Sequence, residues 1–283
     1  MTRTRRFGLS TYFCQERRLA REPLLDIGAH GFECIELYAT PAHVNYHNAT
    51  VVADLQQWLA EARLELHSVH APVAERIVAG RPEAPLTLAS VDSDLRWRAM
   101  HEAQGALHIA RRIPFQVLVL HLGLPRTSQS MRGENSRDAA RRSVEELQRV
   151  AEPLGVRLAL EIFSNELSAP GPLVHFVEQV LEAAPVGICL DLGHAHLQGD
   201  AVEAVETVSE HLIAAHVHDN RGRADEHLIP FEGAIDWPAA LTALQKVGYD
   251  GVFMFEVNGR GGDTAMLERA RRARRRMEGL LAA

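Results

Sequence analysis

Short apolar runs alternate with amphipathic segments along the whole chain. Most of the runs are almost continuously apolar, which is typical of strands covered on both faces. The intervening segments repeat their apolar residues at helical spacing, and Pro172 stands near the start of one, where its missing N–H costs little. The pattern predicts strands over residues 6–11, 32–38, 64–70, 115–121, 156–163, 186–192, 212–218 and 251–257, with helices over 51–62, 95–112, 137–152, 173–184, 201–211, 238–246 and 264–281.

This alternation is the signature of βα units around a parallel sheet. The chain contains no Ser/Gly-rich linker, low-complexity tract or shift in composition that would divide it. We therefore expect one domain over residues 1–283, an α/β fold in which eight βα units close into a (β/α)8 TIM barrel. An open doubly wound sheet is the structural alternative. The long connections 71–94 and 123–137 follow strand C-termini, so they are candidate lids over the active face.

Metal-binding side chains stand at the C-terminal ends of the predicted strands. Charged residues inside apolar runs, such as Glu161 and Glu256, are costly to bury unless they are paired or bind a metal. Strand C-termini share one face of a barrel, so these side chains are expected to form one site. The set is Glu36, His70, His121, Glu161, Asp191, His194, His216, His218 and Glu256.

Residues 216–237 carry the densest part of this set. Alternation along the strand sends His216 and His218 to one side, and Asp225 and His227 follow as an Asp-x-His pair. Neutral imidazole and carboxylate together suit first-row divalent metals. A polar surface loop is the alternative for this segment taken alone.

Four of the candidates lie on neighbouring strands and can converge on one ion. One histidine with three carboxylates is a ligand set that suits a Mn²⁺, Mg²⁺, Co²⁺ or Fe²⁺ site better than a thiolate-rich structural zinc site. The candidate metal ligands are Glu161, Asp191, His216 and Glu256. Further metal or substrate contacts are expected from His70, His121, His194, Asp225 and His227, each of which could instead orient a ligand or be a plain surface residue.

Several other classes of function are disfavoured. No Gly-x-Gly-x-x-Gly or Walker-type loop follows a strand, so we expect no nucleotide cofactor, and Ser10 and Ser68 lack a nucleophile elbow. The net charge of −7 disfavours nucleic acid, and the arginines of residues 269–276 suit the solvated end of an outer helix.

Compartment and assembly are only partly constrained by the sequence. Three cysteines in apolar surroundings, together with the lack of a signal peptide or long apolar span, predict a soluble cytoplasmic protein without a membrane partner. A homo-oligomer stays open.

The chain resembles the xylose isomerase-like TIM barrel superfamily, which contains sugar and sugar phosphate isomerases and epimerases and the related endonuclease IV group (AP endonuclease family 2). The matching pieces span about 190 residues: Ser-Val-His-Ala-Pro at 68–72, His-Leu-Gly at 121–123, Leu-Glu at 160–161, Cys-Leu-Asp-Leu-Gly-His at 189–194, His-Val-His-Asp-Asn at 216–220, Asp-Glu-His-Leu at 225–228, Gly233 with Ile-Asp-Trp at 235–237, and Phe-Glu at 255–256.

The resemblance implies two chemistries. In the epimerase branch, residues matching Glu161, Asp191, His216 and Glu256 bind one divalent ion, the two glutamates exchange the substrate proton, and the position of His194 faces the sugar. In the endonuclease IV branch, three zinc ions are held by positions matching these four and His70, His121, His194, Asp225 and His227. The acidic net charge and the lack of an identifiable duplex-penetrating loop depart from that branch.

The expected activity is the metal-dependent isomerisation or epimerisation of a small sugar, sugar phosphate or polyol ketone through an enediolate. Glu161 and Glu256 would transfer the proton, His194 would hold a hydroxyl, and Arg221 or Arg223 would clamp a distant oxygen or phosphate. The alternative is a multinuclear zinc phosphoesterase, and a sugar-binding module without turnover is a third reading.

Overall fold

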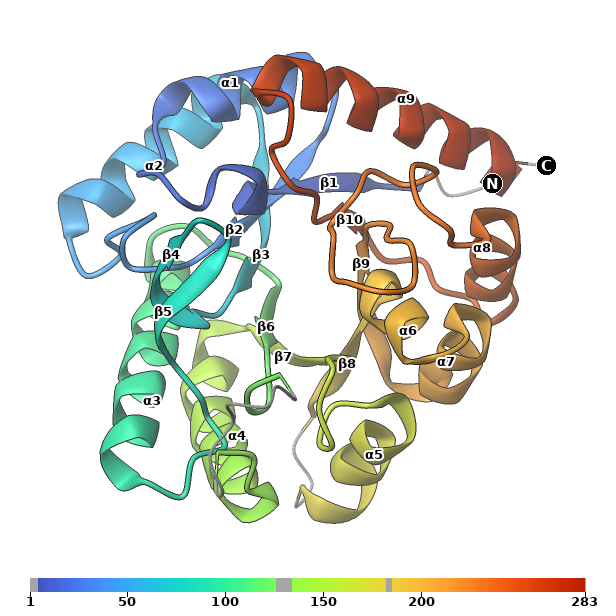
Figure 1. The fold of residues 1–283 in the computed structure, drawn as a ribbon. Helices are drawn as coiled ribbons and strands as arrows, with labels where there is room; N and C mark the ends of the chain where they lie inside the picture. The colour runs from blue at the N-terminus through green and yellow to red at the C-terminus, as the bar shows by residue number, and fades with distance from the viewer. Residues whose placement is uncertain (1–4, 126–133, 182–184, 283) are drawn as a thin grey trace.

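Eight parallel strands close into a barrel surrounded by helices (Figure 1). The computed structural model describes residues 5–125, 134–181 and 185–282. Each predicted run contains one barrel strand, so the predicted TIM barrel is confirmed. The strands run round the barrel in the order β1 (Phe7–Ser10), β10 (Phe253–Phe255), β9 (Leu212–Val217), β8 (Gly187–Asp191), β7 (Arg157–Glu161), β6 (Val117–Leu120), β3 (Glu65–His70) and β2 (Cys34–Tyr38).

The outer helices agree with the apolar periodicity except at three places. In the segment predicted as a helix over 173–184, α5 (Pro170–His175) is followed by a π-helical turn over Phe176–Val180, and residues 182–184 lie outside the described residues. The sequence pattern did not yield α1 or α6, and α6 begins directly after β8 because the Asp191 carboxylate accepts a hydrogen bond from the backbone N–H of His194 at 2.6 Å. The described α-helices are α1 (Arg21–Ala29), α2 (Ala49–Ala62), α3 (Ser93–Leu107), α4 (Arg137–Ala151), α5 (Pro170–His175), α6 (Leu192–Gln198), α7 (Ala201–Val208), α8 (Trp237–Lys246) and α9 (Asp263–Ala282).

Alternation along the strands separates the packing outside the barrel from the interior. In β7, Leu158 and Leu160 pack outward in the main hydrophobic core, whereas Ala159 belongs to a small separate cluster with Cys189 of β8 and Val119 of β6. Glu161 lies two residues after Ala159 in β7, and Asp191 lies two residues after Cys189 in β8. The same two-residue period that buries the leucines therefore carries the carboxylates to the C-terminal mouth of the barrel.

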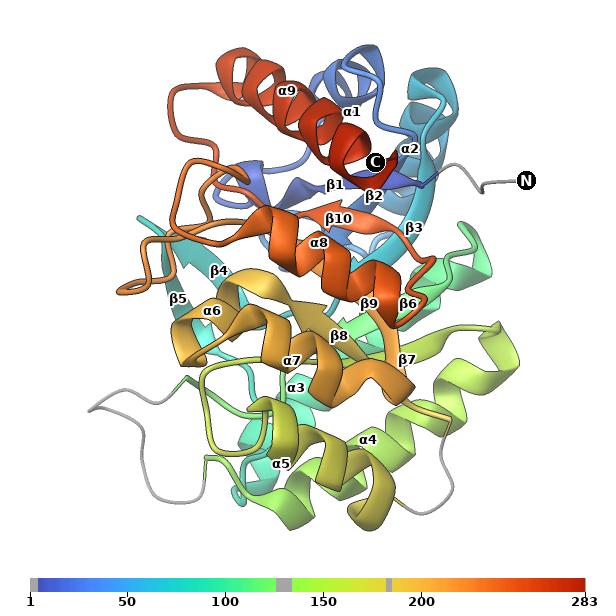
Figure 2. The ribbon, with the colours of Figure 1, turned by 90° about the vertical axis from the view of Figure 1, so that its right-hand side faces the viewer.

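The first long connection forms an antiparallel hairpin of β4 (Ala74–Val78) and β5 (Arg81–Pro85). This hairpin is a two-stranded sheet of its own, and Figure 2 shows it at the same end of the barrel as α6. It therefore overhangs the mouth of the barrel. Part of the second long connection, residues 126–133, lies outside the described residues.

The cysteines and the lack of a long apolar span were among the features from which the sequence predicted the cellular compartment. Cys14, Cys34 and Cys189 are free and buried. Within the described ranges, no helix is both long enough and apolar enough to cross a membrane.

Candidate active site

The four predicted inner ligands meet at the C-terminal ends of β7, β8, β9 and β10. Glu161, Asp191 and His216 end or nearly end their strands, and Glu256 follows β10 directly. One ligand atom from each of the four lies within 4.8 Å of the others, and all four side chains are buried. The strand pairing explains the proximity, because Asp191 and His216 are direct partners across β8 and β9.

His216 is oriented by a buried carboxylate from the opposite side of the barrel. Its Nε2 donates to Glu36 Oε2 at 3.0 Å, and Ser68 Oγ donates to the same oxygen at 2.9 Å. The lone pair of Nδ1 then faces Glu161 Oε1 at 3.4 Å, Glu256 Oε2 at 3.6 Å and Asp191 Oδ2 at 3.7 Å. A carboxylate behind a ligating imidazole is the usual way to fix its tautomer at a metal.

Glu161 also joins a second cluster, with His70 and His121. His70 donates from Nδ1 to the carbonyl of Ala71 at 2.9 Å, and its Nε2 lies 3.0 Å from Glu161 Oε2. His121 Nε2 lies 3.1 Å from the same oxygen without making a hydrogen bond. Two imidazoles and a carboxylate thus share one point on the side of β3 and β6.

A third cluster comprises His194, His218, Asp225 and His227. His194 donates from Nδ1 to the carbonyl of Ile162 at 3.0 Å, and His227 donates from Nδ1 to the carbonyl of Glu256 at 2.7 Å. The Nε2 atoms of both rings lie 3.1 Å from Asp225 Oδ2.

The tautomers of these rings point to bound cations. His70, His194 and His227 each donate Nδ1–H to a backbone carbonyl, so a neutral ring turns a lone pair on Nε2 toward a carboxylate oxygen. Two lone pairs at about 3 Å repel unless a proton or a metal ion lies between them. The site therefore requires protonated histidines or divalent ions.

When no metal ion is bound, the neighbouring carboxylates favour the protonated form of most of these histidines. Burial alone would lower the pKa of these imidazoles, but Glu161 raises that of His70 to about 9 and Asp225 raises that of His227 to about 9. The pKa of His194 lies well above its ordinary value, because Asp191 and Asp225 outweigh burial. His121 is the exception: burial lowers its pKa although Glu161 lies beside it.

The two glutamates differ in their affinity for a proton. Burial would raise the pKa of Glu161, but His121 and His216 hold it well below its usual range. Burial raises the pKa of Glu256, and the nearby Glu161 adds to the effect while His216 opposes it. Environments that push the pKa values of two carboxylates apart in this way are typical of catalytic acid and base pairs.

Several buried polar atoms in the site make no hydrogen bond. They are Glu161 Oε1, Glu256 Oε1, His216 Nδ1 and His121 Nε2. Buried polar atoms are normally satisfied, so this group indicates a ligand between them. Nitrogen and carboxylate oxygen donors at this density fit divalent metal ions.

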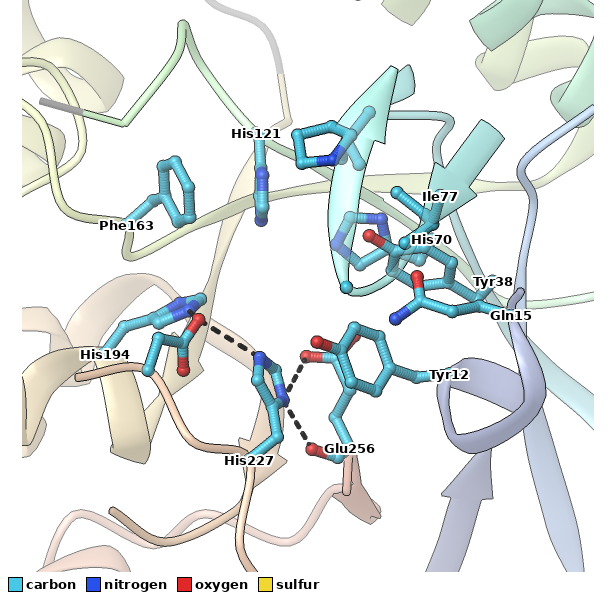
Figure 3. A pocket seen from close by; sticks show the side chains of 14 residues that line it. Tyr12, Gln15, Tyr38, His70, Ile77, His121, Phe163, His194, His227 and Glu256 are labelled. Carbon is cyan, nitrogen blue, oxygen red and sulfur yellow. Dashed lines mark hydrogen bonds and ion pairs between the residues drawn. The ribbon is translucent and has the colours of Figure 1, made fainter. Parts of the chain in front are cut away.

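A cavity of about 120 Å³ opens above the inner ligands. Tyr12, Tyr38 and Phe163 form aromatic walls, and Ile77 and Pro82 of the hairpin line it too (Figure 3). The predicted residues that line the cavity are His70, His121, His194, Asp225, His227 and Glu256.

Arg221 and Arg223 are not brought to this cavity. Both are exposed and absent from its lining, and Arg221 pairs with Glu226 at 2.5 Å. The expected substrate clamp has no support from their placement.

Three residues shape the site in ways that sequence reasoning did not specify. Glu36 was counted among the strand-end acids but not as the partner of His216, and Ser68 was considered only as a nucleophile. His218 donates from Nε2 to Asp191 and stacks on His227 at 4.0 Å. Gly193 allows this arrangement, because a Cβ there would lie 2.0 Å from His218 Cε1. The His-x-His alternation was the signal for His218.

The family model described as "Xylose isomerase-like TIM barrel" matches residues 25–281 of this chain. The chain belongs to this family.

Relatives in the xylose isomerase-like family include named sugar isomerases and epimerases. Inosose isomerase of Bacillus subtilis is 30% identical over 125 residues, which cover 40% of this chain and 44% of that protein. D-psicose 3-epimerase of Ruminiclostridium cellulolyticum is 26% identical over 254 residues, covering 83% of this chain and 76% of that protein. The crystal structure of a D-tagatose 3-epimerase-like protein superposes with a TM-score of 0.78 at 25% identity, with 98% of each chain covered.

Proposed function

We propose that this xylose isomerase-like protein isomerises or epimerises a small unphosphorylated ketose or polyol ketone by proton transfer. The observation that carries the proposal is the convergence of Glu161 and Glu256, from the non-adjacent strands β7 and β10, on Nδ1 of His216 at 3.4 and 3.6 Å. The relatives with named activities support the same class of reaction.

Glu161, Asp191, His216 and Glu256 would hold the divalent ion, which would supply Lewis-acid polarisation of the substrate carbonyl. Glu161 would be the carboxylate that removes a proton from the neighbouring carbon, because its pKa is held low and it stays ionised. Glu256, with its raised pKa, would return a proton from the other side. The two roles exchange when the reaction runs backwards.

The remaining wall of the cavity suits a neutral substrate. Among the described residues, none that lines it is a lysine or an arginine, so a phosphate bound there would lack the guanidinium or ammonium partner that phosphate sites commonly use. Aromatic faces of Tyr12 and Phe163 suit the apolar face of a sugar, and His194 would hold a hydroxyl. Arg17, Arg81 and Arg260 line an adjoining hollow, where Glu16 and Glu226 also lie.

Proton exchange with solvent tests the proposal. The metal-loaded protein incubated with free ketoses and polyol ketones in D₂O should label the carbon next to the carbonyl. Glu161→Gln and Glu256→Gln should each abolish labelling, while Glu178→Gln, a surface change, should not. Labelling of phosphorylated ketoses alone would contradict the neutral substrate. Sugar binding that survives both site substitutions, with no labelling by the native protein, would indicate a binding module.

A zinc-dependent phosphoesterase is the second candidate. It is favoured by the three ligand clusters, two of which include Glu161 and one of which includes Asp225. Elemental analysis separates the two: about one Mn, Co or Mg per chain is expected for the isomerase, and two to three Zn for the phosphoesterase. Metal-dependent cleavage of abasic DNA, with no deuterium exchange, would establish the second candidate.

A further inference from the structure

A separate group of potential metal-binding side chains lies on the surface, outside the cavity of the candidate active site. His47 precedes α2, and His101 and Glu102 lie in α3, in the outer ring of helices (Figure 1). None of the three lines the cavity of the candidate active site. We propose that these three side chains bind a divalent transition-metal ion, with Zn²⁺ the best match, at a site independent of the barrel.

The three ligand atoms are already close together. His47 Nε2 lies 3.0 Å from Glu102 Oε2, and one atom from each of the three residues lies within 4.8 Å of the others. Two imidazoles and one carboxylate form a common protein ligand set for zinc, with water completing the tetrahedron. His47 and His101 are exposed, so water and ions reach them directly.

Neighbouring groups hold this arrangement in place. The buried Tyr46 donates from its hydroxyl at 2.5 Å to Glu102 Oε2, the same oxygen that lies near His47, and so fixes the orientation of the carboxylate. The His47 ring stacks on His101 with centroids 5.2 Å apart, and His101 stacks on Trp97 at 5.2 Å. These contacts hold the two imidazoles close to each other and to the carboxylate.

Gly105 provides the space for His47. A Cβ at this position would lie 2.5 Å from His47 Cε1 and 2.9 Å from Tyr46 Cε2. Glycine is unfavourable inside a helix, so its use in α3 is explained by the close approach of the imidazole and the phenol. A simple surface ion pair, such as His211 with Glu178 at 2.9 Å, has neither a second imidazole nor an orienting phenol.

Metal counting by competition with a chromophoric chelator tests the site. Protein whose barrel site is already loaded should bind about one further Zn²⁺, and His101→Ala or Glu102→Gln should weaken that binding about tenfold or more. Glu102→Gln keeps the size of the side chain and the contact with Tyr46, so it separates loss of a ligand from loss of packing. His211→Ala is the matched control and should bind as the native protein does.

Trp97 provides a second readout. Cu²⁺ bound beside His101 should quench the fluorescence of this exposed side chain, and Trp97→Phe should remove the quenched component. Isomerase activity should stay unchanged in His101→Ala, so failure of this site and failure of the proposed function are distinguishable. The proposal is overturned if the further Zn²⁺ equivalent is absent, or if it persists undiminished in both ligand variants.

Discussion

His43 shows how a single buried imidazole lowers the stability of the fold in acid. Burial lowers its pKa to about 4, although a hydrogen bond from Nδ1 to the carbonyl of Arg17 at 2.5 Å opposes the shift. The folded protein therefore keeps His43 neutral, whereas the unfolded chain protonates it near its ordinary value of 6.5. As pH falls from 6.5 toward 4, the unfolded state binds the additional proton and folding stability declines.

The predicted loss is about 1.4 kcal/mol per pH unit within this window. His43→Asn keeps a nitrogen donor near the position of Nδ1 but cannot titrate. Urea unfolding of both proteins at about pH 7 and about pH 5 should show a smaller loss for the variant. Equal losses would mean that His43 titrates alike in the folded and unfolded states.

Glu36 and Ser68 are predicted to tune metal binding without touching the ion. Glu36→Gln removes the charge behind His216 and should weaken binding at the inner ligands about tenfold or more. Ser68→Ala removes one hydrogen bond to Glu36 and should cost only about 1 kcal/mol. Calorimetric titration with Mn²⁺ provides the comparison, and a larger effect for Ser68→Ala would refute this order.

At the scale of elements, the β4–β5 hairpin is predicted to set substrate fit. Ile77 and Pro82 line the cavity, but neither belongs to a ligand cluster. Ile77→Ala should therefore raise KM several-fold and leave kcat nearly unchanged, because it removes contact that is equal in ground and transition states. Val78→Ala, an exposed neighbour, is the control. A fall in kcat with constant KM would assign the hairpin a part in chemistry.

The sequence predicted the barrel elements well because strands covered on both faces produce continuous apolar runs. It also predicted which strands carry Glu161, Asp191 and His216, since the two-residue period fixes the side to which each points. The hairpin was missed as a hairpin because residues 74–85 mix charges with Pro82 and Pro85, which is the composition of a loop.

Partners distant in sequence could not be predicted. Glu36 contacts His216 across 180 positions, and no local pattern records such a pair. The role of Arg221 as a substrate clamp stays a prediction, and its exposed side chain pairs with Glu226. Local periodicity fixes the direction of a side chain, whereas its partner depends on the closed barrel.

The arginines of α9 illustrate the same point. Arg276 lies over the ring of Phe231 at 4.0 Å, Arg271 pairs with Glu268 and Arg269 with Glu232. These three side chains make their contacts within the molecule, and those contacts could not be read from the run of arginines alone.

For the whole molecule, the site couples metal uptake to pH. The pKa of His216 lies well above its ordinary value, as burial is outweighed by Cys189, Glu36 and Glu256, so an ion at the inner ligands must displace its proton. Metal affinity should therefore rise as pH increases through the neutral range, by about tenfold per unit for each proton released.

Calorimetry in buffers of different ionisation enthalpy counts these protons. Removing the metal with a chelator should also lower Tm, because the ion binds the folded state only. His227→Ala should release fewer protons if the third cluster binds an ion, since the pKa of His227 is raised to about 9. Affinity that stays constant with pH would contradict protonated histidines in the metal-free site.

The hairpin forms a sheet of its own, outside the barrel that carries the carboxylates. Its strands occupy one short stretch of the gene product, and their replacement would leave the hydrogen-bonded ring of eight strands intact. Mutation there could thus alter which substrate fits without disturbing the glutamates to which we assign proton transfer. Such a division makes the scaffold readily evolvable, since a duplicated gene could acquire a new substrate through a dozen codons while inheriting its chemistry unchanged.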